Sequence, residues 1–243
     1  PALGEAHAVV GFVEMHLDYD WEEAERSFLQ AVEVQPGDPL VHHYDASFLL
    51  ARGRFDEARA AWRRATELDP VSAIIAFNAA FPDLYEGRLA RALAQYRRVM
   101  ELGPGFDWTP VWIGAVHLQR GKDAEAIAAM ERVEGSNSHA MGYLGYAYGR
   151  AGREADARAL LRRLDDPDGD LYNAHAVAMI HLGLGETERA LDWLEGAYED
   201  RNTHIVQAAV RPELQVLRGH PRFEALLEHT GLDDVAPPRG PTP

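Results

Sequence analysis

Cysteine is absent from this chain of 243 residues. Its absence excludes thiol catalysis, disulfide bonds and thiolate metal sites, but it does not fix the cellular compartment. Long hydrophobic runs are missing too, and none approaches the roughly 20 apolar residues that a membrane-spanning helix needs. No basic segment followed by an apolar one opens the chain. We therefore expect no secretory signal and a cytoplasmic location.

Positive charge is scarce. There are 24 Lys and Arg residues against 39 Asp and Glu, which gives a net charge of −15 with histidine neutral. A chain this acidic repels the phosphates of nucleic acids and the surface of anionic membranes, so we expect neither as a partner. Hydrophobic residues make up 47 % of the sequence. That share is enough for a sizeable core and excludes disorder of the whole chain.

What the sequence does contain is a repeat. Six alanines recur along the chain, 34, 34, 34, 31 and 33 residues apart, and we call them the marker alanines. A large apolar side chain follows each of them four residues later. A glycine lies five residues before every alanine after the first, and a proline lies twelve residues after each of the first three. The six alanines are Ala24, Ala58, Ala92, Ala126, Ala157 and Ala190. Three markers in phase at this period predict a row of small, similar structural units.

The second unit shows what each marker does. Asp38 is a good helix N-cap, and Pro39 suits the first helical turn, where an N–H would have no partner. Gly53 ends that helix because glycine adopts the left-handed conformation that a stop requires. Apolar side chains then recur every three or four residues over residues 55–68, until Pro70 ends the second helix. Each unit is therefore predicted to be a hairpin of two helices.

These markers resemble the tetratricopeptide repeat family, in which a leucine–glycine pair precedes the alanine, the aromatic residue and the proline. The place of that pair is held by Val10–Gly11, Asp45–Ala46, Ala79–Ala80, Ile113–Gly114, Leu144–Gly145 and Val177–Ala178, whereas the family's tryptophan is missing from all six units. The resemblance covers roughly residues 5–200. It implies an all-α fold, a right-handed superhelical solenoid of about six helix-turn-helix repeats with a C-terminal helical cap.

The resemblance also sets the expected domains. Residues 1–200 would form the solenoid, in which each hairpin touches only its neighbours, and residues 201–232 would form capping helices. Residues 233–243 contain four prolines and are expected to be a disordered tail. The apolar residues expected to cover the last repeat are Val210, Leu214, Leu217, Phe223, Leu226 and Leu227.

Two closing segments, residues 211–214 and 220–227, resemble the C-terminal ends of bacterial regulatory proteins. In those proteins a helical-repeat region follows a winged-helix, nucleotide-cyclase or protein-kinase domain. The chain begins with Pro1 rather than methionine. We interpret this start as that of a trimmed chain or of an excised domain.

No motif in the chain indicates an enzyme. Nucleophile elbows, phosphate-binding loops and the HExxH metal motif are all absent. The eleven histidines share no ligand spacing, and His42 and His43 lie about 100° apart on a helix. The glycines of residues 142–149 have helical spacing, so we interpret them as a close contact between helices. We expect no catalysis, no metal and no cofactor.

The first helix of each repeat would line a concave wall, and its groove-facing positions are largely aromatic. The candidate partner-binding residues are His43, Phe77, Phe81, Tyr85, Trp108, Tyr146, Tyr172 and His175. Aromatic anchors concentrate binding energy, which indicates a groove for an apolar peptide or helix. A second interpretation stays open, in which a tightly wound solenoid buries part of its own inner wall.

Pro82 lies inside the first helix of the third unit, where it deprives the Asn78 carbonyl of its usual partner. We expect a kink there that opens the groove beside Phe77, Phe81 and Tyr85. The alternative is a helix that starts or stops one turn early.

The expected function is a non-catalytic protein-interaction or regulatory scaffold that binds a peptide or a partner domain. The alternatives are a self-assembly module and a small-molecule-sensing domain.

Overall fold

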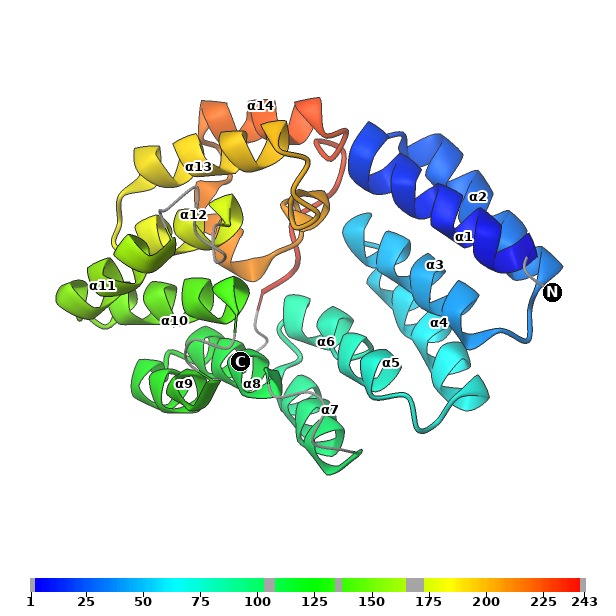
Figure 1. The fold of residues 1–243 in the computed structure, drawn as a ribbon, viewed down its shortest axis with the longest axis horizontal. Helices are drawn as coiled ribbons and strands as arrows, with labels where there is room; N and C mark the ends of the chain where they lie inside the picture. The colour runs from blue at the N-terminus through cyan, green and yellow to red at the C-terminus, as the bar shows by residue number, and fades with distance from the viewer. Residues whose placement is uncertain (1–2, 103–107, 134–136, 165–172, 241–243) are drawn as a thin grey trace. The chain divides into compact units, whose positions relative to one another are not determined.

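The computed structural model describes residues 3–102, 108–133, 137–164 and 173–240, and every regular element in these ranges is a helix (Figure 1). The all-α fold class is therefore confirmed. None of these helices is both long and apolar enough to cross a membrane. In chain order the elements are α1 (Leu3–Val13), η1 (Glu14–Asp18), α2 (Trp21–Val34), α3 (Pro39–Ala51), α4 (Phe55–Leu68), α5 (Ala73–Asn78), α6 (Phe81–Tyr85), α7 (Leu89–Leu102), α8 (Thr109–Gln119), α9 (Asp123–Met130), η2 (Glu131–Val133), α10 (Ser138–Arg150), α11 (Glu154–Leu164), α12 (Ala174–Gly183), α13 (Thr187–Glu199), η3 (Ile205–Gln207), η4 (Pro212–Leu217) and α14 (Pro221–His229).

The chain divides into two compact units. The first unit consists of Pro1–Phe106 and Val206–Pro243, and the second consists of Asp107–Ile205. The first contains the hairpins α1–α2 and α3–α4 and a third in which α5 and α6 together pack on α7. The second contains the hairpins α8–α9, α10–α11 and α12–α13. These six hairpins are the repeats that the alanine period predicted.

The marker residues have the roles that their chemistry predicted. All six marker alanines are fully buried, so the two helices of each hairpin approach closely at these points. At the start of α3 the side chain of Asp38 accepts a hydrogen bond of 2.8 Å from the Leu40 N–H. The five marker glycines all have positive φ, from 69° to 75°, at the turn between the two helices of a hairpin: Gly53, Gly87, Gly121, Gly152 and Gly185.

Glycines bring α10 and α12 into backbone contact. A Cβ atom added to Gly149 would lie 2.4 Å from the carbonyl carbon of Gly183, and one added to Gly183 would lie 2.4 Å from the carbonyl oxygen of Tyr146. Real Cβ atoms do not approach other atoms so closely. The interpretation of residues 142–149 as a close helix contact is confirmed.

The first helix of the third hairpin is broken, as Pro82 predicted. Helix α5 ends at Asn78 and α6 begins at Phe81, so Pro82 occupies the first turn of a new helix, where its missing N–H leaves no bond unmade. The groove does not open beside the break, however. Phe77, Phe81 and Tyr85 are all buried.

The segment after Ile205 differs most from expectation. The predicted capping residues are buried, but residues 206–240 belong to the first unit, where they pack on helices from the start of the chain. Trp21 Nε1 donates to the Thr230 carbonyl over 2.6 Å. The expectation that each hairpin touches only its neighbours in sequence is therefore wrong for this segment.

Residues 233–240, which their composition predicted to be disordered, also make specific contacts with the first unit. Val235 is only 4 % exposed, and Asp234 forms an ion pair of 2.6 Å with Arg52. Residues 241–243 of the predicted tail lie outside the described residues.

Candidate functional site

Four of the candidate partner-binding residues lie in the first unit. Phe77 and Phe81 pack edge to face with ring centroids 5.5 Å apart, and the Phe81 and Tyr85 rings are 5.6 Å apart. The Tyr85 hydroxyl donates to the side-chain oxygen of Gln207 over 2.8 Å, and burial raises the pKa of this hydroxyl. The structure thus brings the three residues together as a buried cluster, with little ring surface left for a partner.

His43, in helix α3, is half-buried. Its Nδ1 accepts a hydrogen bond of 3.2 Å from Trp62 Nε1, and burial lowers its pKa to about 4. The imidazole is therefore neutral at pH 7. In this state it acts as a hydrogen-bond acceptor for the tryptophan that fills the second hairpin.

Three of the other candidates lie in the second unit, and Tyr172 lies outside the described residues. Trp108 is half-buried and packs edge to face on His139, with ring centroids 6.4 Å apart. Tyr146 is also half-buried, with the guanidinium carbon of Arg150 5.8 Å from its ring centroid. His175 is buried. Of the eight predicted residues, His43, Trp108 and Tyr146 are described and half-buried.

His175 belongs to a stack of imidazoles in the second unit. The rings of His139 and His204 lie 4.6 Å apart and nearly parallel, and His175 lies 6.0 Å from His139 and 5.0 Å from His204. His204 follows α13, where the repeat period has ended, so the period gave no signal for it. Among the described residues, no group of three or more His, Asp or Glu side chains has the geometry of a metal site.

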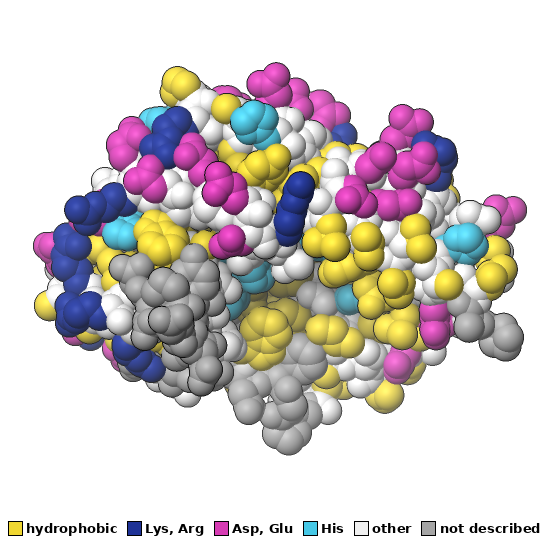
Figure 2. Space-filling model, turned by 45° about the horizontal axis from the view of Figure 1, so that its top comes forward, with side chains coloured by type: hydrophobic (Ala, Val, Ile, Leu, Met, Phe, Trp, Pro, Cys, Tyr) yellow, Lys and Arg dark blue, Asp and Glu magenta, His cyan; other side chains and the backbone are white. Residues whose placement is uncertain are grey.

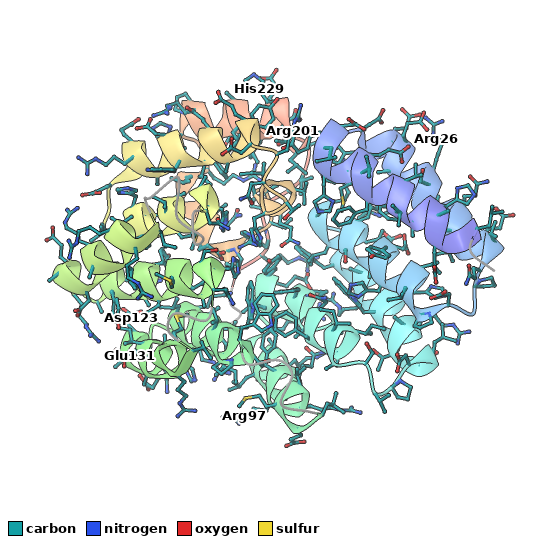
Figure 3. All side chains as sticks on the ribbon, in the orientation of Figure 1. Arg26, Arg97, Asp123, Glu131, Arg201 and His229 are labelled. Carbon is teal, nitrogen blue, oxygen red and sulfur yellow. The ribbon has the colours of Figure 1, made fainter. Side chains whose placement is uncertain are left out.

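Ion pairs join neighbouring hairpins at the outer surface. Arg150 lies 3.3 Å from Asp123, and Arg153 lies 3.1 Å from Glu131. Both acids, labelled in Figure 3, come from the segment α9–η2, whereas the arginines come from the end of α10 and the turn after it. Exposed pairs of this kind contribute about 0–1 kcal/mol each, so we regard them as surface links between hairpins.

An exposed apolar surface on α1 was missed by the sequence analysis. Helix α1 is apolar on two opposite faces. Its inner face, Gly4, Ala8, Gly11 and Met15, is buried, and Gly11 lies against the ring of Phe28 in α2. Its outer face continues into η1 and is exposed, with 39–62 % exposure for its four large side chains. We call this outer face the α1 seam, and it consists of Leu3, Ala6, Val10, Val13 and Leu17.

The spacing of the α1 seam is that of a helix-packing surface. Its residues follow one another at intervals of 3, 4, 3 and 4 positions, which is the repeat that joins helices in coiled coils. Val9 and Phe12 widen the apolar surface on one side. In Figure 2 hydrophobic side chains gather over the N-terminal helices, at the right of the view. A helix that is apolar on two faces is normally buried on both.

Later hairpins show what covers this face elsewhere in the chain. Val13 aligns with Phe48 of α3, because both lie two residues after the second member of the leucine–glycine pair. Phe48 is buried and packs on Phe28 of the preceding helix α2, with ring centroids 5.5 Å apart. The aligned residues Ala147 and Ile180 are buried as well. The α1 seam is therefore the position at which a preceding helix packs on the first helix of a hairpin.

Comparison with protein families finds a match in one part of the chain. Two overlapping segments, residues 20–73 and 46–81, match the family described as Tetratricopeptide repeat. The matched residues span parts of the first three hairpins. No curated protein sequence matches the chain.

Solved structures extend the likeness to most of the chain. PilF of Pseudomonas aeruginosa is 15 % identical with a TM-score of 0.57, and the match covers 93 % of this chain and 97 % of PilF. PilW, a widely conserved type IV pilus biogenesis factor, is 18 % identical with a TM-score of 0.59, covering 89 % and 99 %. A TPR protein of Thermus thermophilus is 18 % identical with a TM-score of 0.61, covering 77 % and 98 %. At these identities the likeness establishes a tetratricopeptide-type fold.

Proposed function

We propose that this chain of tetratricopeptide-type hairpins is a non-catalytic protein-interaction module, and that an amphipathic helix from outside this sequence binds along the α1 seam. The observation that supports the proposal is the exposure of Leu3, Val10, Val13 and Leu17 at helix-packing spacing. Monomeric proteins rarely expose contiguous apolar surface of this kind without a partner.

A helix is the occupant that the seam fits best. Side chains at intervals of 3 and 4 form a narrow stripe, which a second helix covers when it lies alongside. The same position on α3 is covered by α2 of the preceding hairpin, so a docked helix would continue a contact already present within the chain. Covering the four large side chains would contribute about 1 kcal/mol of binding free energy per side chain, because each is already partly buried.

Charge favours a basic helix from another protein over a second copy of this chain. The net charge is −15, and the exposed acids Glu5 and Asp18 lie beside the seam. Two copies would bring like charges together, whereas a helix with lysine or arginine flanking its apolar stripe would be attracted. The same argument weighs against self-assembly as the main function.

The predicted aromatic residues remain second candidates within each unit. In the first unit His43 is half-buried, and in the second unit Trp108 and Tyr146 are half-buried. The resemblance of the closing segments to bacterial regulatory proteins supports a regulatory role for the module in the cytoplasm. We propose this role as the context in which the helix would bind.

The proposal is tested with a designed amphipathic peptide of about 20 residues, a length that supports a stable helix. The peptide has a leucine stripe and a lysine-rich polar face, and its binding is followed by fluorescence anisotropy. The double variant Val10→Glu with Val13→Glu disrupts the seam at exposed positions. The control, Val216→Glu, makes the same change at a valine that is 73 % exposed in η4.

We expect the natural chain and the control to bind the peptide equally and the double variant to bind at least about tenfold more weakly. Both substitutions at the seam add negative charge, so attraction by charge alone would strengthen binding of the basic peptide. Equal or tighter binding by the double variant would therefore rule out the seam. Light scattering of the pure chain over a range of concentrations tests self-assembly, and a rise to the dimer mass would favour that alternative.

A further inference from the structure

The C-terminal residues of the first unit lie on a surface that resembles a peptide-binding groove. We call residues 234–239 the strap. They have no regular secondary structure, and among them only Val235 is buried, while Asp234, Ala236 and Pro237 are exposed. A single apolar anchor flanked by exposed residues is the arrangement in which a peptide binds a groove.

The groove that holds the strap is built from two parts of the first unit, the turn after α3 and the residues on either side of η4. Val235 inserts between Gly53, at the turn from α3 to α4, and Val210. A Cβ atom added to Gly53 would lie 3.1 Å from Val235 Cγ1 and 3.7 Å from Val210 Cγ1. The left-handed glycine therefore provides the room that the valine occupies, and any side chain at this position would reduce it.

Two arginines hold the strap and the residue Gly231 before it. Arg218 Nη2 donates to the Val235 carbonyl over 2.9 Å. Arg52 Nη1 donates to the Gly231 carbonyl over 2.8 Å, and Arg52 Nη2 binds the carboxylate of Asp234 over 2.6 Å. The guanidinium of Arg52 lies over the ring of Trp21, 5.3 Å from its centroid, which fixes its position. The strap is thus held by one contact to a main-chain carbonyl and one to a carboxylate, which suits an extended chain with an acidic residue before its anchor.

The charges of strap and groove are complementary at both ends. Asp234 lies at the arginine end, whereas Arg239 lines a cavity of about 310 Å³ together with Asp56, Glu57 and Glu86. A second cavity of about 460 Å³ is lined by Val235 together with Trp21, Arg52 and Asp234 among others. Space beside the strap would admit side chains larger than its own. Charge at each end would fix the direction of the bound chain.

We propose that the groove formed by Trp21, Arg52, Gly53, Val210 and Arg218 is a peptide-binding site, and that the chain closes it with its own strap. The ligand that it takes when the strap is lifted is an extended peptide with an acidic residue, a valine-sized anchor, one or more prolines and a basic end. The strap is then an autoinhibitory contact in cis, separate from the α1 seam.

The test uses the chain shortened to end at Asp233, which removes the strap and keeps α14 and the buried Leu232. The probe is a fluorescent synthetic peptide with the sequence of residues 234–240, and its binding is measured by anisotropy. A tethered segment acts at an effective concentration of about millimolar, so we expect the full chain to bind the peptide about tenfold or more weakly than the shortened chain. The same peptide carrying the Val235→Glu change should not bind.

Two arginine variants of the shortened chain show whether binding uses this groove. Arg52→Ala should weaken binding of the peptide about tenfold, because it removes the charged hydrogen bond to Asp234. Arg26→Ala should leave binding unchanged, because Arg26 lies on the outside of α2 and pairs with Glu22 and Glu23 (Figure 3). Equal binding by the two variants would overturn the assignment of the groove.

A full-length variant covers the case in which shortening the chain disturbs folding. Val235→Glu places a charge in the apolar pocket and should lift the strap, so that the full chain binds the peptide as the shortened chain does. Helix content is checked by circular dichroism. If either opened form keeps its helices but fails to bind, the proposal is overturned. If both lose their helices, the strap is part of the core and the proposal is overturned as well.

Discussion

The backbone contact between α10 and α12 gives the sharpest test of the fold. In Gly183→Ala, the added Cβ would lie 2.4 Å from the carbonyl oxygen of Tyr146 and 2.6 Å from its Cα atom. These are backbone atoms and cannot turn aside as a side chain does, so the two helices must separate. Overpacking of this kind costs about 1–3 kcal/mol. We expect the free energy of unfolding to fall by that amount.

Gly196→Ala in the neighbouring helix α13 is the matched control. Nothing lies within 4 Å of the Cβ that it would add, and its backbone is helical. Alanine favours a helix over glycine by up to about 1 kcal/mol, so this variant should be as stable as the natural chain or more stable. Urea unfolding followed by circular dichroism measures both. If Gly183→Ala matches Gly196→Ala in stability, the two helices are not in backbone contact and the reasoning fails.

Two further predictions use the same unfolding assay. Burial raises the pKa of Asp45 to about 6, so the folded chain keeps a proton that the unfolded chain releases near its ordinary value of 3.8. The contribution of Asp45 to stability is then largest below about pH 4 and falls by up to about 3 kcal/mol as the pH rises to about 6, and Asp45→Asn should remove this contribution from the pH dependence. An unchanged pH dependence would contradict the burial of that carboxylate. Tyr85→Phe should cost about 1–2 kcal/mol because it removes the bond to Gln207, whereas Tyr96→Phe should cost less, since the Tyr96 hydroxyl is buried without a hydrogen-bond partner among the described residues. Equal losses would show that the hydroxyl of Tyr85 adds nothing.

Local chemistry made the hairpins predictable from the sequence. Ala58 is small enough for close helix packing, and Gly53 takes up the left-handed turn after α3. Pro82 cannot continue a helix from the preceding turn. Each of these effects acts over a few residues, so the period of the sequence reveals it directly.

Contacts between distant segments left no such signal. Arg52 and Asp234 are 182 positions apart, and no period links them. Composition predicted a disordered tail, whereas one buried valine and two arginines hold residues 234–239 in place. The six-hairpin pattern also gave no indication that residues 206–240 join the first unit.

The candidate interaction residues were the least predictable part. Helical spacing shows which residues share a face, but it does not show whether another helix covers that face. Phe77, Phe81 and Tyr85 share a face and are covered, whereas Val10 and Val13 share a face and are exposed. The interval of 3 and 4 residues along residues 3–17 was visible in the sequence. Only the structure distinguishes the covered apolar face of α1 from the open one.

Hydrogen exchange measured by mass spectrometry, with and without the basic amphipathic peptide, tests the central claim most directly. A helix docked on the α1 seam would slow exchange of the backbone amides in residues 3–17. The account predicts slower exchange in that segment, with residues 77–85 and 139–179 unchanged. Slower exchange in residues 77–85 or 139–179, with residues 3–17 unchanged, would place the interaction surface on the aromatic residues predicted from the sequence and contradict the account.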